Sequence, residues 1–193
     1  MMAKIKFFAP SHYMVFSTLA GKLESTNDFN KADIVILPGG ADISPWLYSD
    51  EIGESRGMDY GRDVREAQLV VEARILNIPV FGICRGAQLL HALNGGTLVK
   101  HLKEHHTRDH SVVDARTKQV QFQVNSLHHQ AIPPEEAIAM YGIENVLLSE
   151  DGFCTEAFVD YKRNVCGVQY HPEYTSCPKQ GIEFAFNMID SMV

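Results

Sequence analysis

Short apolar segments alternate along the chain with segments of helical periodicity, and this alternation constrains the fold more than any other feature. Residues 4–8, 33–37 and 79–83 are short and mostly apolar, as expected of strands buried on both faces of a parallel sheet. Between the last two, residues 62–77 have the 3.6-residue periodicity of an amphipathic helix. The pattern predicts an open α/β sandwich with a mostly parallel sheet.

The helix predicted over residues 62–77 should bury one apolar face. Val64, Ala67, Val71 and Ile75 recur at spacings of three and four, with charged residues elsewhere on the helical wheel. We therefore expect these four side chains to face the sheet.

Later segments continue the alternation. A helix is predicted over residues 85–93, because a glycine pair that can end it follows shortly afterwards. Residues 118–124 alternate between apolar and polar types, which indicates a strand with one exposed face. Residues 156–161 and 164–170 are typical of a strand pair joined by a turn, and residues 178–193 should form a closing helix.

Composition limits the partners of the chain. Its 193 residues suit a single domain over residues 1–193, and 17 basic against 24 acidic residues give a net charge of −7. This charge argues against binding to nucleic acid or to an anionic membrane, and favours a small molecule or another protein. With no membrane-spanning run and no recognisable leader, we expect a cytoplasmic protein.

Cys84 lies where a predicted strand becomes a predicted helix, between Gly82 and Gly86. A nucleophile on such a sharp turn projects above the carboxyl edge of the sheet, and the flanking glycines avoid Cβ clashes. The positive end of the helix would stabilise a thiolate, and the N–H of Arg85 would point toward an oxyanion. The alternative is a buried structural cysteine.

His171 and Glu173 follow the last predicted core strand, and both suit an activated thiol. A thiol needs a base, and the base needs a third group to orient its ring. Residues two apart in extended backbone point to the same side, so His171 and Glu173 can meet. The alternative is a surface histidine beside a carboxylate.

Gly39 and Gly40 directly follow the strand predicted over residues 33–37. Glycines let the backbone come close to a ligand, and the N–H of Gly40 could complete an oxyanion hole with that of Arg85. Three loops at the carboxyl ends of strands would then carry the nucleophile, the base and the oxyanion donors, where open α/β sheets bind ligands.

The ordered motifs PGGADISP, GICRGAQLL, NSLHHQAI and VQYHPE resemble those of the class I glutamine amidotransferase superfamily. Within it the chain looks most like the γ-glutamyl-γ-aminobutyrate hydrolase-like branch of cysteine peptidases. The resemblance implies a flavodoxin-like three-layer sandwich. It also implies a Cys84, His171 and Glu173 triad that cleaves a γ-glutamyl amide through a glutamyl thioester.

The resemblance further implies a pocket for the glutamyl head group. Its residues would be Gln88, Asn125, Ser126, Leu127 and His128. Gln88 also lies one helical turn after Cys84 and so faces the same side. The alternative for Gln88 is a solvent-facing helix residue. The amine that leaves is not determined by the sequence.

No metal and no cofactor are expected. The histidines at 101, 105, 106 and 110 include pairs at the i, i+4 spacing of helical metal ligands, but a polar mobile loop is the favoured interpretation. The four cysteines form no CxxC pair, so a disulfide framework is not expected. Cys154 and Cys166 are interpreted as strand packing and Cys177 as an exposed bystander.

Two other functions stay open. The chain could be a glutaminase subunit that delivers ammonia to a separate synthetase, with glutamine as its substrate. It could also be a non-enzymatic redox sensor of the ThiJ/PfpI type, although His171 and Glu173 would then have no purpose. The oligomeric state is open too, with a homodimer as one option.

Overall fold

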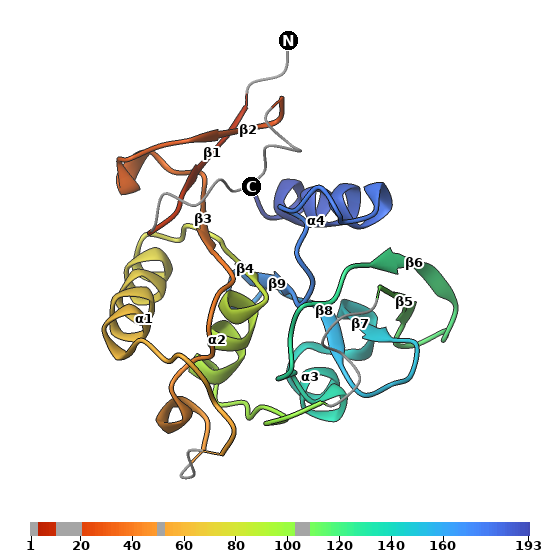
Figure 1. Cartoon of the computed structure of the whole chain (residues 1–193). Helices are drawn as coiled ribbons and strands as arrows, with labels where there is room; N and C mark the ends of the chain where they lie inside the picture. Colours follow the sequence, from red (N-terminus) through yellow and green to blue (C-terminus); the bar gives the residue numbers. More distant parts are fainter. Residues whose placement is uncertain (1–3, 11–20, 50–52, 103–108) are drawn as a thin grey trace.

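The computed structural model describes residues 4–10, 21–49, 53–102 and 109–193, and these residues form one nine-stranded sheet. The strands follow the order β2-β1-β3-β4-β9-β8-β7-β5-β6 across it (Figure 1). Their bounds are β1 Ile5–Phe8, β2 Leu23–Ser25, β3 Ile34–Leu37, β4 Val80–Ile83, β5 His110–Asp114, β6 Val120–Val124, β7 Val146–Ser149, β8 Thr155–Asp160 and β9 Val165–Val168.

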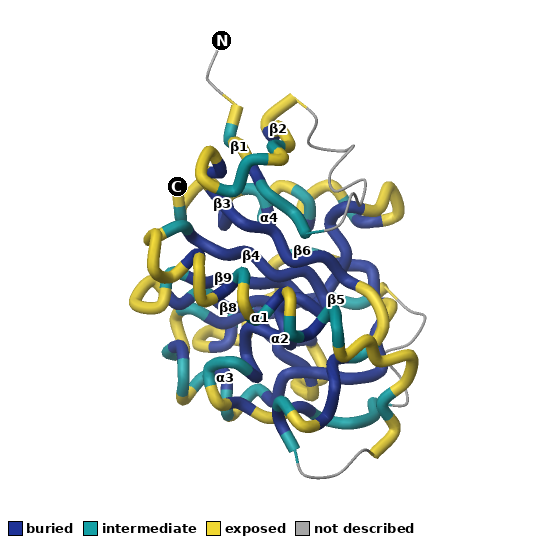
Figure 2. Tube along the Cα trace, turned by 90° about the vertical axis from the view of Figure 1, so that its left-hand side faces the viewer, coloured by how far each residue is buried: buried dark blue, intermediate teal, exposed yellow. Residues whose placement is uncertain are grey.

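Strand direction divides the sheet into two parts. The five strands from β2 to β9 in this order pair in parallel, whereas every pair from β9 to β6 is antiparallel. The central strands β3, β4 and β9 are buried along their whole length (Figure 2). This explains their continuous apolar sequences, because both of their faces are covered.

Four α-helices cover the two faces of the sheet. They are α1 Tyr60–Ile75, α2 Arg85–Leu93, α3 Pro134–Tyr141 and α4 Lys179–Met192, and short 3₁₀ turns lie at Phe29–Lys31, Pro45–Leu47 and Ile143–Asn145. Alternate residues of a strand serve opposite faces. Ile36 accordingly packs in the core that contains α4, whereas its neighbours Val35 and Leu37 pack in the core shared with α1, α2 and α3.

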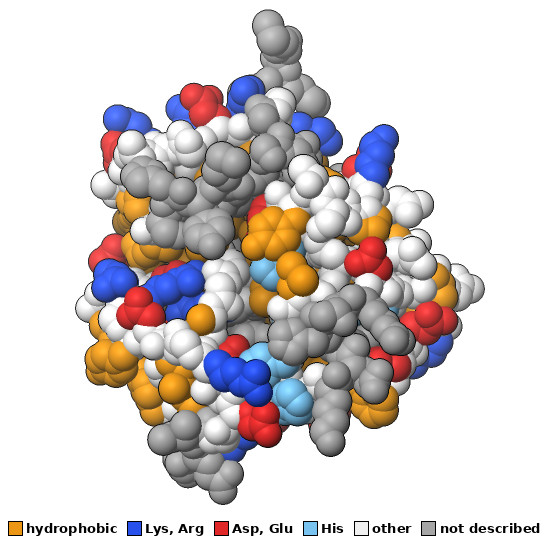
Figure 3. All heavy atoms as spheres, viewed as in Figure 1, with side chains coloured by type: hydrophobic (Ala, Val, Ile, Leu, Met, Phe, Trp, Pro, Cys, Tyr) orange, Lys and Arg blue, Asp and Glu red, His pale blue; other side chains and the backbone are white. Residues whose placement is uncertain are grey.

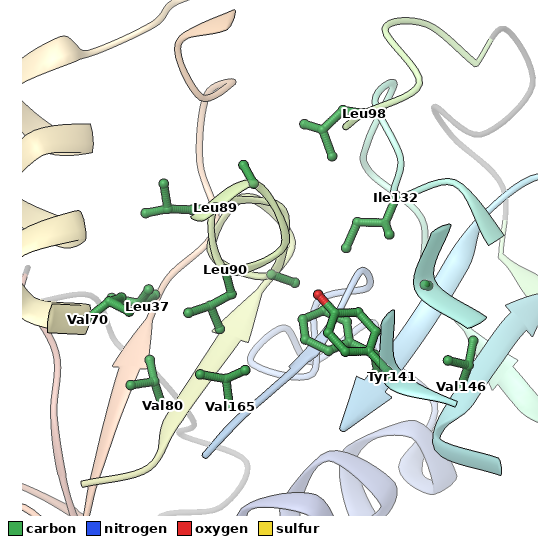
Figure 4. Close-up of a cluster of buried hydrophobic side chains, with 14 of the residues drawn as sticks. Leu37, Val70, Val80, Leu89, Leu90, Leu98, Ile132, Tyr141, Val146 and Val165 are labelled. Atoms are coloured by element: carbon green, nitrogen blue, oxygen red, sulfur yellow. The ribbon is translucent and has the colours of Figure 1, made fainter. Parts of the chain in front are cut away.

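The core beneath α1, α2 and α3 is built from aliphatic side chains of both layers. Leu90 points from α2 toward Val80 and Val165 of the sheet (Figure 4). Tyr141 of α3 stacks on Phe158 of β8, with ring centroids 4.4 Å apart. The structure therefore has three layers, and the predicted flavodoxin-like sandwich is confirmed.

The predicted inner face of α1 is wrong. Val71 and Ile75 are exposed, and the buried positions of this helix are Asp63, Glu66, Val70 and Ala73. The helix is rotated because both carboxylates turn inward to a buried guanidinium, a partner that no periodicity within the helix can reveal.

Several elements were not predicted from the sequence, namely β2, β5, β7 and α3. His110 begins β5, so it is not a helical residue, and residues 105 and 106 lie outside the described residues. Cys177 is only 5% exposed, so its interpretation as an exposed bystander is also wrong.

Membrane-spanning helices are absent from the part of the chain that the structure describes. None of its helices combines sufficient length with sufficient apolar character to cross a bilayer.

Candidate active site

Cys84 and His171 follow two neighbouring parallel strands, β4 and β9. Ile83 pairs with Val168 in the register of these strands, and the N–H of Cys84 donates to the carbonyl of Val168 at 2.7 Å. On the other side of β4, Leu37 of β3 pairs with Gly82. The turns after β3, β4 and β9 therefore meet at one carboxyl edge, where open α/β sheets place their ligands.

The turn at Cys84 is strained and tightly packed. Cys84 has φ 49° and ψ −105°, which non-glycine residues rarely adopt. A Cβ on Gly86 would lie 2.2 Å from the carbonyl oxygen of Leu37, and one on Gly82 would lie 2.5 Å from the nitrogen of Ala87. Both glycines are thus required by close backbone approach, and they allow the nucleophile to begin α2 directly at the strand end.

His171 and Glu173 form a buried pair. Nδ1 of His171 lies 2.7 Å from Oε1 of Glu173, and both residues are less than 10% exposed. Burial opposes a charge on the imidazole, but hydrogen bonds with Cys84 and Glu173 outweigh it and raise the pKa of His171 to about 10. The site therefore favours an imidazolium beside the sulfur, which is the arrangement that activates a thiolate.

Two further residues hold His171 in place. The side chain of Asn125 accepts the N–H of His171 at 2.9 Å and donates to its carbonyl oxygen at 3.1 Å. The ring of Tyr174 stacks on the imidazole with centroids 4.8 Å apart and planes within 4°. Backbone and ring are thus both held, and Asn125, expected from the resemblance to bind substrate, has both amide groups engaged with the base-bearing loop.

Gly39 separates the turn after β3 from the catalytic pair. A Cβ on this residue would lie 2.6 Å from Cε1 of His171 and 3.5 Å from Cβ of Cys84. These two contacts place Cys84 and His171 against the same backbone atom, which shows that the fold brings the sulfur-bearing and imidazole-bearing residues together.

Replacing Gly39 by alanine should displace the imidazole and lower kcat/KM by about 10²-fold or more, because misplacing a reacting group by about 1 Å has an effect of this size. Steady-state kinetics measure the loss. Gly21→Ala is the matched control, since a Cβ there meets no atom within 4 Å. Unchanged activity of Gly39→Ala would contradict the assignment of His171 as the base.

The side chain of Arg85 is directed away from the site. It is 2% exposed and forms ion pairs with Asp63 and Glu66 of α1. Glu66 also accepts from Nε of Arg62 at 2.7 Å, and Nη2 of Arg62 donates to the carbonyls of Pro38 and Gly39, each at 2.9 Å. This network connects the start of α2 to the turn after β3. It leaves the Arg85 backbone N–H, and not its guanidinium, for an oxyanion.

Replacing Glu66 by glutamine should destabilise the protein by about 3–5 kcal/mol, because it leaves a buried guanidinium without its charge partner. Urea denaturation followed by circular dichroism measures this difference. Glu72→Gln makes the same change at an exposed position of α1 and should stay within about 0.5 kcal/mol of the parent. Equal stabilities of the two variants would show that the network contributes little.

Gln88 and Gln169 form an amide chain beneath the nucleophile. Nε2 of Gln88 donates to Oε1 of Gln169 at 3.2 Å, and Nε2 of Gln169 lies 3.5 Å from Sγ of Cys84. Gln88 is 3% exposed, so it is not the solvent-facing residue of the alternative interpretation. Gln169 was missed in the sequence, although it occupies the position after β9 that matches Cys84 after β4.

The other residues expected to line the head-group pocket lie in the loop after β6. Ser126 and His128 are buried, whereas Leu127 is 49% exposed. Histidine side chains also reach the surface of the face shown in Figure 3. His129 lies 2.9 Å from Asp42, and Nδ1 of His101 lies 3.5 Å from Nδ1 of His129.

Residues 14–173 match the model of the Peptidase C26 family. The chain belongs to this family. The resemblance expected from the four ordered motifs is thereby confirmed.

Known relatives agree with this assignment. The chain is 32% identical over 168 residues to the glutamine amidotransferase-like protein YvdE of Lactococcus lactis, covering 77% of this chain and 69% of that protein. It is 30% identical over 172 residues to the γ-glutamyl-γ-aminobutyrate hydrolase PuuD of Escherichia coli, covering 76% and 66%.

Solved structures show the same fold at low identity. One Thermoplasma acidophilum protein, assigned to GMP synthase as one of its subunits, has a TM-score of 0.66 at 16% identity, covering 100% of this chain and 95% of that one. This likeness supports the predicted architecture. The family indicates an amidotransferase or hydrolase of the cysteine-dependent kind.

Proposed function

We propose that the protein hydrolyses the C–N bond of γ-glutamyl amides, with Cys84 as nucleophile, His171 as base and Glu173 as its partner. The observation that carries this proposal is the meeting of Cys84 and the His171–Glu173 pair at one carboxyl edge, against the backbone of Gly39. Similarity to a γ-glutamyl-γ-aminobutyrate hydrolase supports the substrate class.

The first half-reaction forms a thioester. The thiolate of Cys84 adds to the γ-carbonyl carbon, and the N–H groups of Gly40 and Arg85 hold the resulting oxyanion. The imidazolium of His171 then donates its proton to the departing nitrogen, the C–N bond breaks, and the amine leaves. Gln169 supports the thiolate, because its amide nitrogen lies 3.5 Å from the sulfur.

The second half-reaction releases glutamate. His171, now neutral, removes a proton from water, and the hydroxide adds to the thioester carbonyl. Collapse of this intermediate breaks the C–S bond, which restores the thiolate beside the imidazolium. Glu173 keeps the imidazole oriented through Nδ1 in both halves.

Mass spectrometry with a panel of γ-glutamyl compounds tests the proposal. We expect a glutamyl adduct on the peptide that contains Cys84, together with release of glutamate and the free amine. The compound that is cleaved fastest identifies the amine side. Intact panel compounds and an unmodified thiol would reject the proposed function.

Glutamine in the same panel tests the second candidate, a glutaminase subunit that delivers ammonia to a synthetase. The fold likeness to a protein assigned to GMP synthase favours keeping this candidate. Brisk hydrolysis of γ-glutamyl amines by the isolated chain supports the hydrolase. Cleavage of glutamine alone supports the glutaminase, and oxidation of Cys84 without any cleavage supports the redox sensor.

A further inference from the structure

A second cluster of chemically reactive side chains lies away from the triad. Nε2 or Nδ1 of His128, Sγ of Cys154 and a carboxylate oxygen of Glu156 all lie within 4.8 Å of one another. His128 belongs to the loop after β6, Cys154 precedes β8, and Glu156 is the second residue of β8. All three are buried, and Cys154 and Glu156 have no exposed surface. Nitrogen, sulfur and oxygen donors thus converge in the interior.

His128 is held as a metal-binding histidine usually is. Its Nδ1 lies 2.9 Å from the carbonyl oxygen of Gln130, which only accepts, so the proton is on Nδ1. Nε2 therefore presents its lone pair, and this atom lies 3.9 Å from Oε1 of Glu156. Ligating histidines commonly donate their other N–H to a backbone carbonyl, which fixes the tautomer and the ring direction.

Glu156 places a charge in the interior that no described lysine or arginine balances. Within the described ranges its ion-pair contacts are with histidines, at 3.0 Å for Nε2 of His110 and 3.9 Å for His128. Oε2 is buried and accepts no hydrogen bond from any described residue. Burial alone would raise the pKa of Glu156, but hydrogen bonding to His110 and the charge of His128 hold it below its usual value. A buried carboxylate of this kind requires a cation.

We propose that His128, Cys154 and Glu156 bind a zinc ion. Zinc takes this mixture of imidazole, thiolate and carboxylate ligands, and its charge of 2+ is neutralised by one thiolate and one carboxylate. Ligand bonds of about 2.0–2.3 Å require donor atoms roughly 3.3–3.8 Å apart, so the side chains would close by about 1 Å. His110 reaches the same carboxylate and is the candidate fourth ligand.

Binding would deprotonate Cys154. Burial and the neighbouring Glu156 raise the pKa of this thiol in the metal-free chain, whereas a coordinated thiol is a thiolate. The sequence alone predicts no metal here, because the three residues are separated along the chain and their spacing matches no metal-binding motif.

Zinc at this cluster would fasten the loop after β6 to β8. The same loop carries Asn125, which holds the backbone of His171, and Gln130, whose carbonyl accepts from both His128 and Gln88. The ion would therefore support the active-site edge without touching the substrate.

Metal titration of the full chain tests the site, with Cys84→Ala as the starting protein so that the catalytic thiol cannot bind the ion. After chelator treatment, zinc should bind at one equivalent and raise Tm. Cobalt(II), used as a spectroscopic probe, should give a thiolate-to-cobalt charge-transfer band and the intense visible bands of tetrahedral coordination.

Two variants locate the metal. Cys154→Ser should abolish the charge-transfer band, and Glu156→Gln should weaken zinc binding by more than about 100-fold, beyond the loss caused by outer-shell changes. Cys166→Ser, at an equally buried cysteine of β9, is the matched control and should leave both unchanged. Circular dichroism verifies folding. Absence of stoichiometric zinc in the starting protein, or a charge-transfer band that survives Cys154→Ser, overturns the proposal whether or not the chain hydrolyses amides.

Discussion

Replacing Cys84 by alanine should lower the hydrolysis of γ-glutamyl amides by at least about 10⁴-fold, because no thioester can then form. Alanine keeps the Cβ at the strained φ of 49° and removes only the sulfur, so the fold should persist. Initial rates of amine release measure the loss, and circular dichroism verifies the structure.

Cys166→Ala is the matched control for this change. Cys166 is fully buried in β9, and burial holds the pKa of its thiol well above the usual value, so it is not a nucleophile. We expect this variant to keep its activity and to lose some stability from the cavity. Activity that survives Cys84→Ala would reject the nucleophile and with it the proposed mechanism.

Replacing Glu173 by glutamine should lower kcat/KM on the order of 10³-fold, because the imidazole loses the carboxylate that orients it and stabilises its charged form. Oε1 is the atom that contacts Nδ1 of His171, at 2.7 Å. Steady-state kinetics measure the effect, and Glu183→Gln at an exposed position of α4 is the control. Equal activity of both variants would exclude Glu173 from the site.

The same variant should also change the pH profile. In the parent, His171 has a pKa raised to about 10, so its charged form is present below that pH and is lost above it. Removing the carboxylate lowers this pKa, since an opposite charge nearby shifts a pKa by roughly 1–3 units. The alkaline limb of kcat/KM should therefore move to lower pH by at least about one unit. A limb that stays in place would show that Glu173 does not set the charge of His171.

Much of the fold was predictable because it depends on local patterns. The predicted strands at residues 33–37 and 79–83 correspond to β3 and β4, and the helix predicted over residues 85–93 is α2. Buried parallel strands are continuously apolar, and a glycine-flanked turn ends one element and starts the next, so both leave local signals. The antiparallel strands β5 and β7 were missed, because their burial depends on neighbours distant in the chain.

The candidate triad was also predicted from the sequence, since each member follows a recognisable strand. The sequence by itself determined the layered α/β architecture, the family and the position of Cys84 at a strand end, because these depend on residue periodicity and on short ordered motifs. Tertiary structure alone decided what surrounds these residues. It turned Asp63 and Glu66 inward to Arg85, engaged Asn125 with the backbone of His171, and placed His128 beside Cys154 and Glu156. The physical reason is that buried charges and hydrogen-bonding groups are satisfied by partners brought close through folding, and sequence spacing does not encode those partners.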